Sequence, residues 1–158
     1  MRTRIFGKLV VAAVVVIAVA TATMDVAIRT SWEGSLRRQI TLALTQKTSL
    51  FANHVSDVAR SDLQQLVVGD AQAAGARGTV ITSEGKVLAD SEANPPEMEN
   101  HATRPEFVAA LHGTIGSNTR RSHTLGTDFL YVAAPVHGGA VRLAYPLSEI
   151  RQAIRRFA

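Results

Sequence analysis

The sequence has 158 residues, no cysteine and a formal net charge of +4 at pH 7. This length suits one compact domain with appended segments, and the lack of cysteine excludes disulfide bonds, thiolate metal sites and a cysteine nucleophile in this chain. Many basic residues gather within residues 1–8 and 151–156. That distribution suits membrane headgroups better than a nucleic-acid groove, so no nucleic-acid partner is expected.

The uncharged apolar run at residues 9–24, LVVAAVVVIAVATATM, predicts a transmembrane helix. It would span about 24 Å at roughly 1.5 Å per residue, a little less than a hydrocarbon core of about 30 Å. A cleavable signal peptide is the alternative, with residues 18–20 as the small-x-small cleavage site. We favour an uncleaved signal anchor because the apolar run continues past that site. Residues 1–8 should then be cytoplasmic and residues 25–158 extracytoplasmic.

Residues 25–68 are predicted to form one long extracytoplasmic helix. They contain no proline and a single glycine, Gly34, and their apolar residues recur at spacings that keep one helix face: Leu36, Ile40, Leu44, Phe51, Val55, Val58 and Leu66. The stripe suits packing on the chain's own domain or a seam with a second copy, so a homodimer is one expectation. The segment at 69–78, GDAQAAGARG, predicts a linker because it is rich in glycine and small residues.

Residues 77–147 have the pattern of a small domain of strands. The segment TVITSEGKVLADS (79–91) predicts a hairpin, and further strands are predicted at about 115–123, 128–136 and 140–146. In the last of these, apolar residues alternate with Arg142 and Ala144, as in a strand with one buried face.

Short helices complete this domain. Pro105 suits an early helical position and Gly113 a helix stop, so a short helix is predicted between the hairpin and the later strands. Ser148 fits the N-cap of an exit helix over 148–158, which would lead to a second membrane span. The order indicates an α+β fold, a five-stranded antiparallel sheet with helices on one side.

Three segments carry a family likeness: VLADS, MENHATRPEFVAALHG, and RRSHTLGTDFLYVAAPV. Together they resemble the extracytoplasmic PAS-like (Cache-like) sensor domain of phosphate-regulon-type sensor histidine kinases, over about residues 77–150. In that family a second membrane helix, a HAMP linker, a histidine-bearing dimerisation helix and an ATP-binding domain follow the sensor. This sequence ends at Ala158 without an ATP lid or a kinase-like phosphoacceptor histidine.

The resemblance implies a signal-input domain of a two-component sensor histidine kinase, in the bacterial inner membrane, that is not itself an enzyme. Two alternatives stay open. The chain could be the input domain of a chemoreceptor or a diguanylate cyclase, or it could be a stand-alone binding module, membrane-tethered or secreted, that acts through a partner.

The resemblance also implies a ligand site, because the Arg-Pro pair ahead of the short helix commonly lies beside the ligand pocket in Cache-like domains. Arg104 would pair with a carboxylate or another anion, and His101 would add a pH-dependent hydrogen bond. Arg120 and Tyr131 would line the same concavity. The expected partner is a small anionic ligand or an extracytoplasmic protein.

Purely structural roles are the alternative for the same segment. Asn100 or Thr103 would cap the helix, Arg104 would bridge to Glu106 or Asp90, and His101 would be a satisfied loop residue.

Other chemistry has weaker support. Glu97, Glu99 and His101 alternate like metal ligands, but no second histidine stands at a fixed helical offset. Ser122 and His123 are adjacent without a nucleophile elbow or a triad order. We therefore expect no metal, no cofactor and no catalytic residue.

Overall fold

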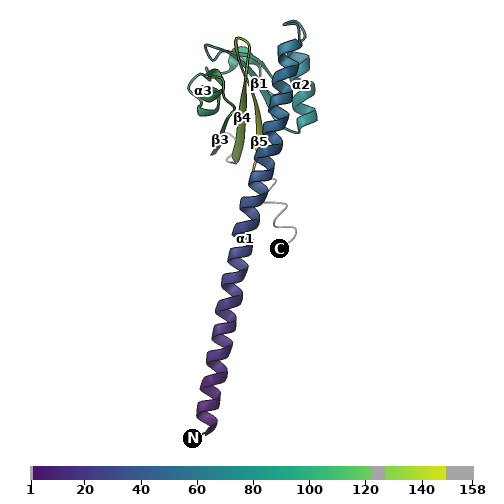
Figure 1. Ribbon diagram of the computed structural model, residues 1–158. Coiled ribbons are helices and arrows are strands. Elements are labelled where there is room, and N and C mark those ends of the chain that lie inside the picture. Colours follow the sequence, from purple (N-terminus) through teal and green to yellow (C-terminus); the bar gives the residue numbers. More distant parts are fainter. Residues whose placement is uncertain (1, 122–126, 149–158) are drawn as a thin grey trace. The chain divides into compact units, whose positions relative to one another are not determined.

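The computed structural model describes residues 2–121 and 127–148 (Figure 1). The chain divides into two compact units, Met1–Gln39 and Ile40–Ala158. Its elements are α1 (Arg2–Asp57), α2 (Leu63–Ala74), β1 (Arg77–Thr82), β2 (Val87–Asp90), the 3-10 helix η1 (Pro95–Glu97), α3 (Pro105–Leu111), β3 (Gly116–Arg121), β4 (Asp128–Val136) and β5 (Gly139–Pro146).

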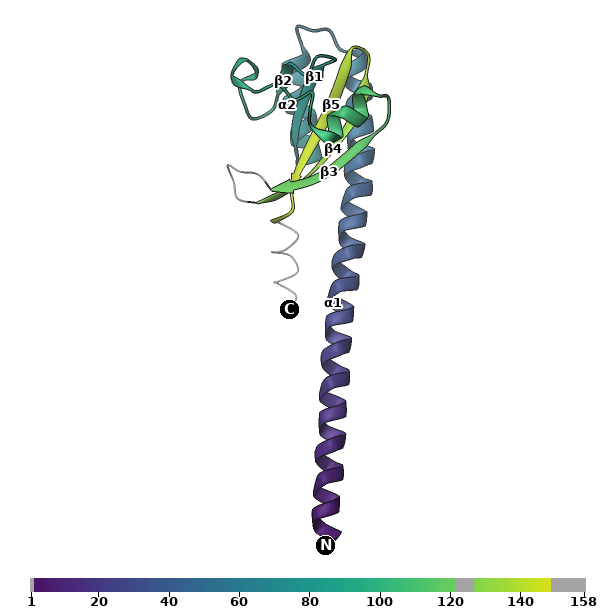
Figure 2. The same cartoon turned by 90° about the vertical axis from the view of Figure 1, so that its left-hand side faces the viewer.

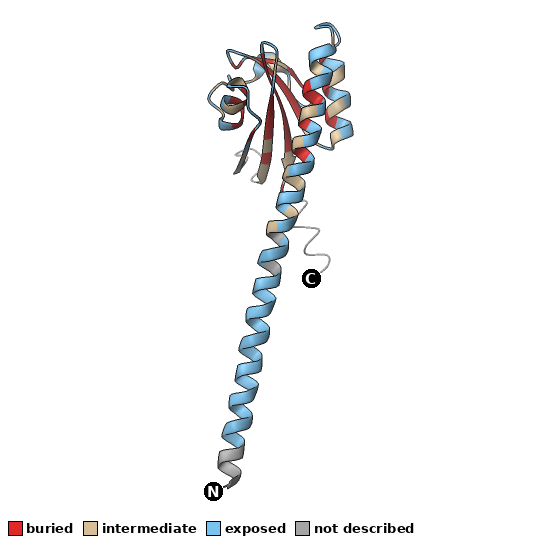
Figure 3. Ribbon diagram, viewed as in Figure 1, coloured by how far each residue is buried: buried red, intermediate tan, exposed pale blue. Residues whose placement is uncertain are grey.

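The first unit is the leading part of α1, and its apolar side chains from Leu9 to Val26 are exposed (Figure 3). Its threonine hydroxyls donate to carbonyls one turn back, as from Thr21 to Ile17 (2.9 Å) and from Thr23 to Val19 (3.0 Å). Such bonds satisfy the hydroxyl groups within the helix itself. By length and composition α1 could cross a membrane, a property that signal sequences near an N-terminus share.

The second unit is built on a five-stranded antiparallel sheet in the order β2-β1-β5-β4-β3. Helix α3 lies on one face and the end of α1 with α2 on the other (Figures 1 and 2). The prediction of an α+β fold with five antiparallel strands and flanking helices is confirmed. The prediction that helices cover one side only is wrong, because α3 has a buried face of its own.

The larger core lies between the sheet and α1 with α2. It contains Leu44, Phe51, Ala52, Leu63, Val67, Val80, Ala89, Leu130, Val132, Ala134, Val141, Leu143 and Leu147. The smaller core lies beneath α3 and contains Ile81, Val87, Phe107, Ala110, Ala133 and Ala140. Since successive residues of a strand face opposite sides, β4 and β5 supply both cores alternately.

The predicted single helix over 25–68 is two helices, and the predicted linker at 69–78 is largely the second of them. Helix α2 ends at Gly75, whose φ of 64° places it in the left-handed region that favours glycine. A Cβ on Gly78 would lie 3.2 Å from that of Ala71 and 3.4 Å from Val67. The small residues therefore serve close packing of α2 on the sheet rather than flexibility, and packing outweighs helix propensity here.

Side-chain bonds join α1 to α2. The Lys47 ammonium donates to the Ala74 carbonyl at 2.8 Å, and His54 Nδ1 lies 2.8 Å from an Asp70 carboxylate oxygen. Because a later residue of α1 meets an earlier residue of α2, the two helices run antiparallel. The predicted exit helix after Ser148 lies outside the described residues.

Candidate functional site

The site lies on the sheet face beneath α3, where the strand register brings polar residues into one row. Gly116, Ala133, Arg142, Thr79 and Asp90 are successive cross-strand partners from β3 to β2. The next row on the same face contains Asn118, Tyr131, Ala144 and Arg77. These rows place Arg142 in the middle of the sheet, where it is buried.

Glu106 of α3 is the centre of this polar network, with no exposed surface. Its two carboxylate oxygens accept from Arg120 Nη1 at 2.8 and 2.9 Å, and one of them also accepts from Arg142 Nη1 at 3.2 Å. Burial opposes ionisation of the carboxyl, but these hydrogen bonds and charges outweigh it and hold the Glu106 pKa below its usual value. The network therefore contains a buried carboxylate clamped by two guanidinium groups.

Aromatic rings cover the two guanidinium groups. The guanidinium carbon of Arg120 lies 3.8 Å from the Tyr131 ring centroid. That of Arg142 lies 4.9 Å from the Phe107 centroid and 5.1 Å from the Tyr131 centroid. Cation–π contact of this kind compensates part of the cost of burying a charge.

A second carboxylate, Asp90, stands beside this pair and is also buried. It accepts from Arg77 Nε at 3.0 Å, from the Thr79 hydroxyl at 2.7 Å and from the backbone N–H groups of Glu92 and Ala93 at 2.9 Å. Burial opposes ionisation, but these donors hold the Asp90 pKa low. Three arginines thus meet two buried carboxylates in one network.

His101 is buried beside this network, with 8 % of its surface exposed, and its ring stacks on Phe107 at a centroid distance of 6.1 Å. Neither ring nitrogen has a hydrogen-bond partner among the described residues. Burial and the nearby positive charges, first that of Arg142, lower the His101 pKa to about 4. The imidazole is therefore neutral at pH 7, and the interpretation of His101 as a satisfied loop residue is wrong.

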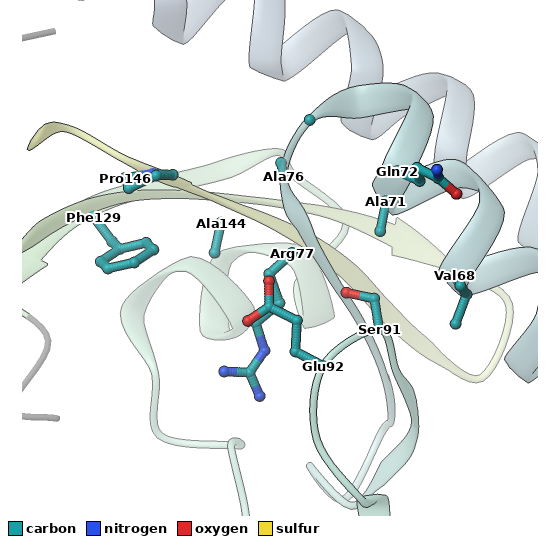
Figure 4. Close-up of a pocket in the computed structure, with 11 residues that line it drawn as sticks. Val68, Ala71, Gln72, Ala76, Arg77, Ser91, Glu92, Phe129, Ala144 and Pro146 are labelled. Carbon is teal, nitrogen blue, oxygen red and sulfur yellow. The ribbon is translucent and has the colours of Figure 1, made fainter. Parts of the chain in front are cut away.

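A groove of about 590 Å³ opens next to the network (Figure 4). Phe129, Ala144 and Pro146 lie along one side of it, and α2 contributes the other. Arg77, which bonds Asp90, lines the groove, and the Phe129 ring lies 6.0 Å from the Tyr131 ring. The volume suits a small molecule, since ligand pockets commonly measure about 300–1,000 Å³.

The structure brings three of the four predicted site residues to this region. Arg120 and Tyr131 stack on each other, and His101 lies beside them. Arg104 is different: its side chain is 38 % exposed, and its Nη2 lies 3.6 Å from a Glu99 carboxylate oxygen. Arg104 is also the residue that precedes α3, and no side chain caps that helix.

The alternating acidic residues do not form a metal site within residues 2–121 and 127–148, where no group of three His, Asp or Glu side chains is close enough to hold an ion. Ser122 and His123 lie outside the described residues.

Sequence reasoning missed Glu106, Arg142, Thr79 and Asp90 as members of the network. Arg142 was expected on the solvated face of its strand, but all of residues 139–144 are buried because α3 covers that face. One observation could have indicated it: Arg142 is the one charged residue in a largely apolar strand, and the short helix at Pro105–Leu111 contains a glutamate.

No family model and no curated protein sequence matches the chain, but several solved structures do. The sensor domain of the histidine kinase DctB of V. cholerae has a TM-score of 0.58 at 19 % identity, over 80 % of this chain and 58 % of that one. The ligand-binding domain of the chemoreceptor Tlp3 of Campylobacter jejuni, in complex with 4-methylisoleucine, has a TM-score of 0.62 at 12 % identity. That match covers 75 % of this chain and 56 % of the Tlp3 chain.

The sensor domain of E. coli DcuS has a TM-score of 0.55 at 15 % identity, over 74 % of this chain and 98 % of that one. The chain therefore spans little more than half of the DctB and Tlp3 domains and nearly all of the DcuS domain. At these identities the likeness establishes the fold alone, which this chain shares with the sensor domains of DctB and DcuS and the ligand-binding domain of Tlp3.

Proposed function

We propose that this chain is the extracytoplasmic signal-input domain of a membrane-anchored sensor histidine kinase, and that it responds to a small anionic ligand. The observation that carries this proposal is the arginine cluster on the α3 face, in which Arg142 is buried and Arg77 is partly exposed to a groove beside the cluster. A sensor-domain fold supplies the context, and the cluster supplies a chemical reason for an anion to bind.

The finer relationship, to phosphate-regulon-type kinases, is supported by the sequence motifs. The segments that carry the likeness contribute Asp90, Glu106, Arg120 and Tyr131, all members of the network. A shared buried network is a physical reason for such segments to be alike.

The ligand would enter the groove with its apolar part against Phe129, Ala144 and Pro146 and its anionic group toward Arg77. Arg104, half-exposed at the approach to α3, and the unpartnered ring nitrogens of His101 would add contacts. A ligand shifts a domain between two arrangements only by its differential affinity for them. Contacts with both β1 and the α3 region would supply such a difference.

A role of α1 in anchoring and signal transmission is supported by its composition, since it holds both the apolar segment and residues that pack on the sheet. We place residues 9–24 in the inner membrane and residues 25–158 outside. The exposed side chains of Leu42 and Leu50, eight residues apart on α1, support a homodimer contact in the second unit. Leu42→Glu with Leu50→Glu should then give a monomer in light scattering, and an unchanged mass would contradict this contact.

The ligand proposal is tested by thermal unfolding of the full chain in detergent micelles with small carboxylates, amino acids and phosphate, against chloride at equal ionic strength. At least one compound should raise the melting temperature. Arg104→Ala should fold normally and lose part of that rise, whereas the matched control Arg60→Ala, an exposed arginine between α1 and α2, should keep it. No stabilising compound, or equal loss in both variants, would refute the proposal.

The input domain of a chemoreceptor is the second candidate, favoured by the structural likeness to Tlp3. The two candidates share the site and differ in the output module, so the coding sequence after codon 158 discriminates between them.

A further inference from the structure

Glu106 has the geometry of a bound ligand rather than that of an ordinary surface ion pair. Its carboxylate has no exposed surface and receives three hydrogen bonds of 2.8, 2.9 and 3.2 Å from two guanidinium groups. The arginines come from β3 and β5, whereas Glu106 comes from α3, which packs on the sheet from outside. The sheet thus supplies the cationic receptor and the helix supplies the anion.

The receptor half is held in place without Glu106. Arg142 Nη2 lies 3.2 Å from the Thr79 hydroxyl oxygen on the adjacent strand, and the Tyr131 ring lies against both guanidinium groups. Arg142 Nε, on a side chain that is 5 % exposed, has no partner among the described residues. A buried donor without a partner is a position where a further acceptor oxygen would be stabilising.

We propose that Arg120 and Arg142 form a carboxylate-binding site that Glu106 fills as a tethered ligand. A free carboxylate of one negative charge gains this position only when Glu106 leaves it. Glu106 is the second residue of α3, and Gly116 of β3 lies so close to its backbone that a Cβ there would collide with the Glu106 carbonyl oxygen. This close backbone contact holds the first turn of α3, and with it Glu106, against the sheet.

This inference concerns the chain's own carboxylate and does not depend on the identity or existence of the ligand proposed above. That ligand would bind in the neighbouring groove, whereas the tethered site is occupied within the folded chain. The two proposals therefore succeed or fail separately.

Chemical rescue tests the inference. Glu106→Ala removes the tethered carboxylate and leaves room for formate, and Glu106→Gln removes the charge while keeping the side chain in place. The full chain is unfolded thermally in detergent micelles with sodium formate or sodium chloride at equal ionic strength. The near-ultraviolet circular dichroism of its two tyrosines, Tyr131 and Tyr145, reports on the sheet domain.

Formate should raise the melting temperature of Glu106→Ala by about 4 °C or more over chloride, and should leave the wild type and Glu106→Gln unchanged. If Glu106→Ala does not fold in chloride, formate should restore its tyrosine spectrum. The inference would be overturned if formate did not raise the melting temperature of Glu106→Ala over chloride, or if it raised that of Glu106→Gln equally.

Discussion

Loss of the Glu106 charge should be among the most costly single changes in the sheet domain. In Glu106→Gln, the guanidinium of Arg142, on a side chain only 5 % exposed, loses its counter-charge, whereas that of Arg120, 25 % exposed, can be partly hydrated. Breaking a buried ion pair costs about 3–5 kcal/mol. Because the amide oxygen can still accept one bond, we expect the lower value of about 3 kcal/mol. At about 4 °C per kcal/mol for a domain of this size, the melting temperature should fall by about 12 °C.

The pH dependence of this loss gives a second, independent test. Burial would raise the Glu106 pKa, but the arginine hydrogen bonds outweigh it, so the pKa is lower in the folded state than in the unfolded state. The carboxylate therefore stabilises the fold fully above the unfolded carboxyl pKa of about 4.3, and this contribution is lost as the pH falls through the folded-state pKa. The difference between wild type and Glu106→Gln should be full at pH 7 and should shrink below about pH 4.

Thermal unfolding of the full chain in detergent at several pH values, followed by the tyrosine signals, measures both effects. The matched control is Glu99→Gln, since that side chain is 86 % exposed and lies 3.6 Å from Arg104. Its melting temperature should change by less than about 2 °C. A Glu106→Gln variant that is as stable as Glu99→Gln at pH 7 would refute the account of Glu106 as a clamped buried carboxylate.

Three further changes test the packing and the electrostatics of the α3 face. Phe107→Ala should lower the free energy of unfolding in urea by about 3–5 kcal/mol because the ring is fully buried. Val108→Ala should lower it far less because that side chain is 39 % exposed. Similar losses in the two variants would contradict the placement of α3 on the sheet. Gly139→Ala should destabilise the fold because a Cβ there would collide with a carbonyl oxygen of β1. Gly69→Ala, in open space on α2, should raise the free energy of unfolding by up to about 1 kcal/mol. The reverse order of melting temperatures would contradict the register between β1 and β5. The pKa of His101 falls from about 6.5 in the unfolded chain to about 4 in the fold, so wild-type stability should decline as the pH falls from about 6.5 to about 4. His101→Gln should lack this decline. Identical pH profiles of stability in the two proteins would count against a buried neutral imidazole.

The strands were predictable from the sequence because their patterns are local. The predicted strands at 128–136 and 140–146 correspond to β4 and β5, and Gly138, with a φ of 76°, makes the turn between them. Pro105 marked the start of α3 for an equally local reason. The helical region was predicted less well, because small residues in α2 look like a linker until their packing on Gly78 is known.

The polar network was only partly predictable because it depends on long-range register. Arg142 and Glu106 are 36 residues apart, and Arg142 and Thr79 are 63 apart. Their meeting follows from the strand order β2-β1-β5-β4-β3, which no local pattern contains. Arg120 and Tyr131 were named from family likeness, but the same likeness directed attention to Arg104 rather than to Glu106 two residues later.

The central claim, that a small anion binds on the α3 face of the sheet, is tested most directly by nuclear magnetic resonance of the arginine Nε–H groups. The full chain, labelled with ¹⁵N-arginine in detergent micelles, would be titrated with small carboxylates, amino acids and phosphate at constant ionic strength, and signals would be assigned with single Arg→Lys variants. The account predicts a saturable shift at Arg77, which lines the groove, with at least one compound and none at Arg60. A shift that is absent at Arg77 with every compound, or equal at Arg77 and Arg60, would contradict it.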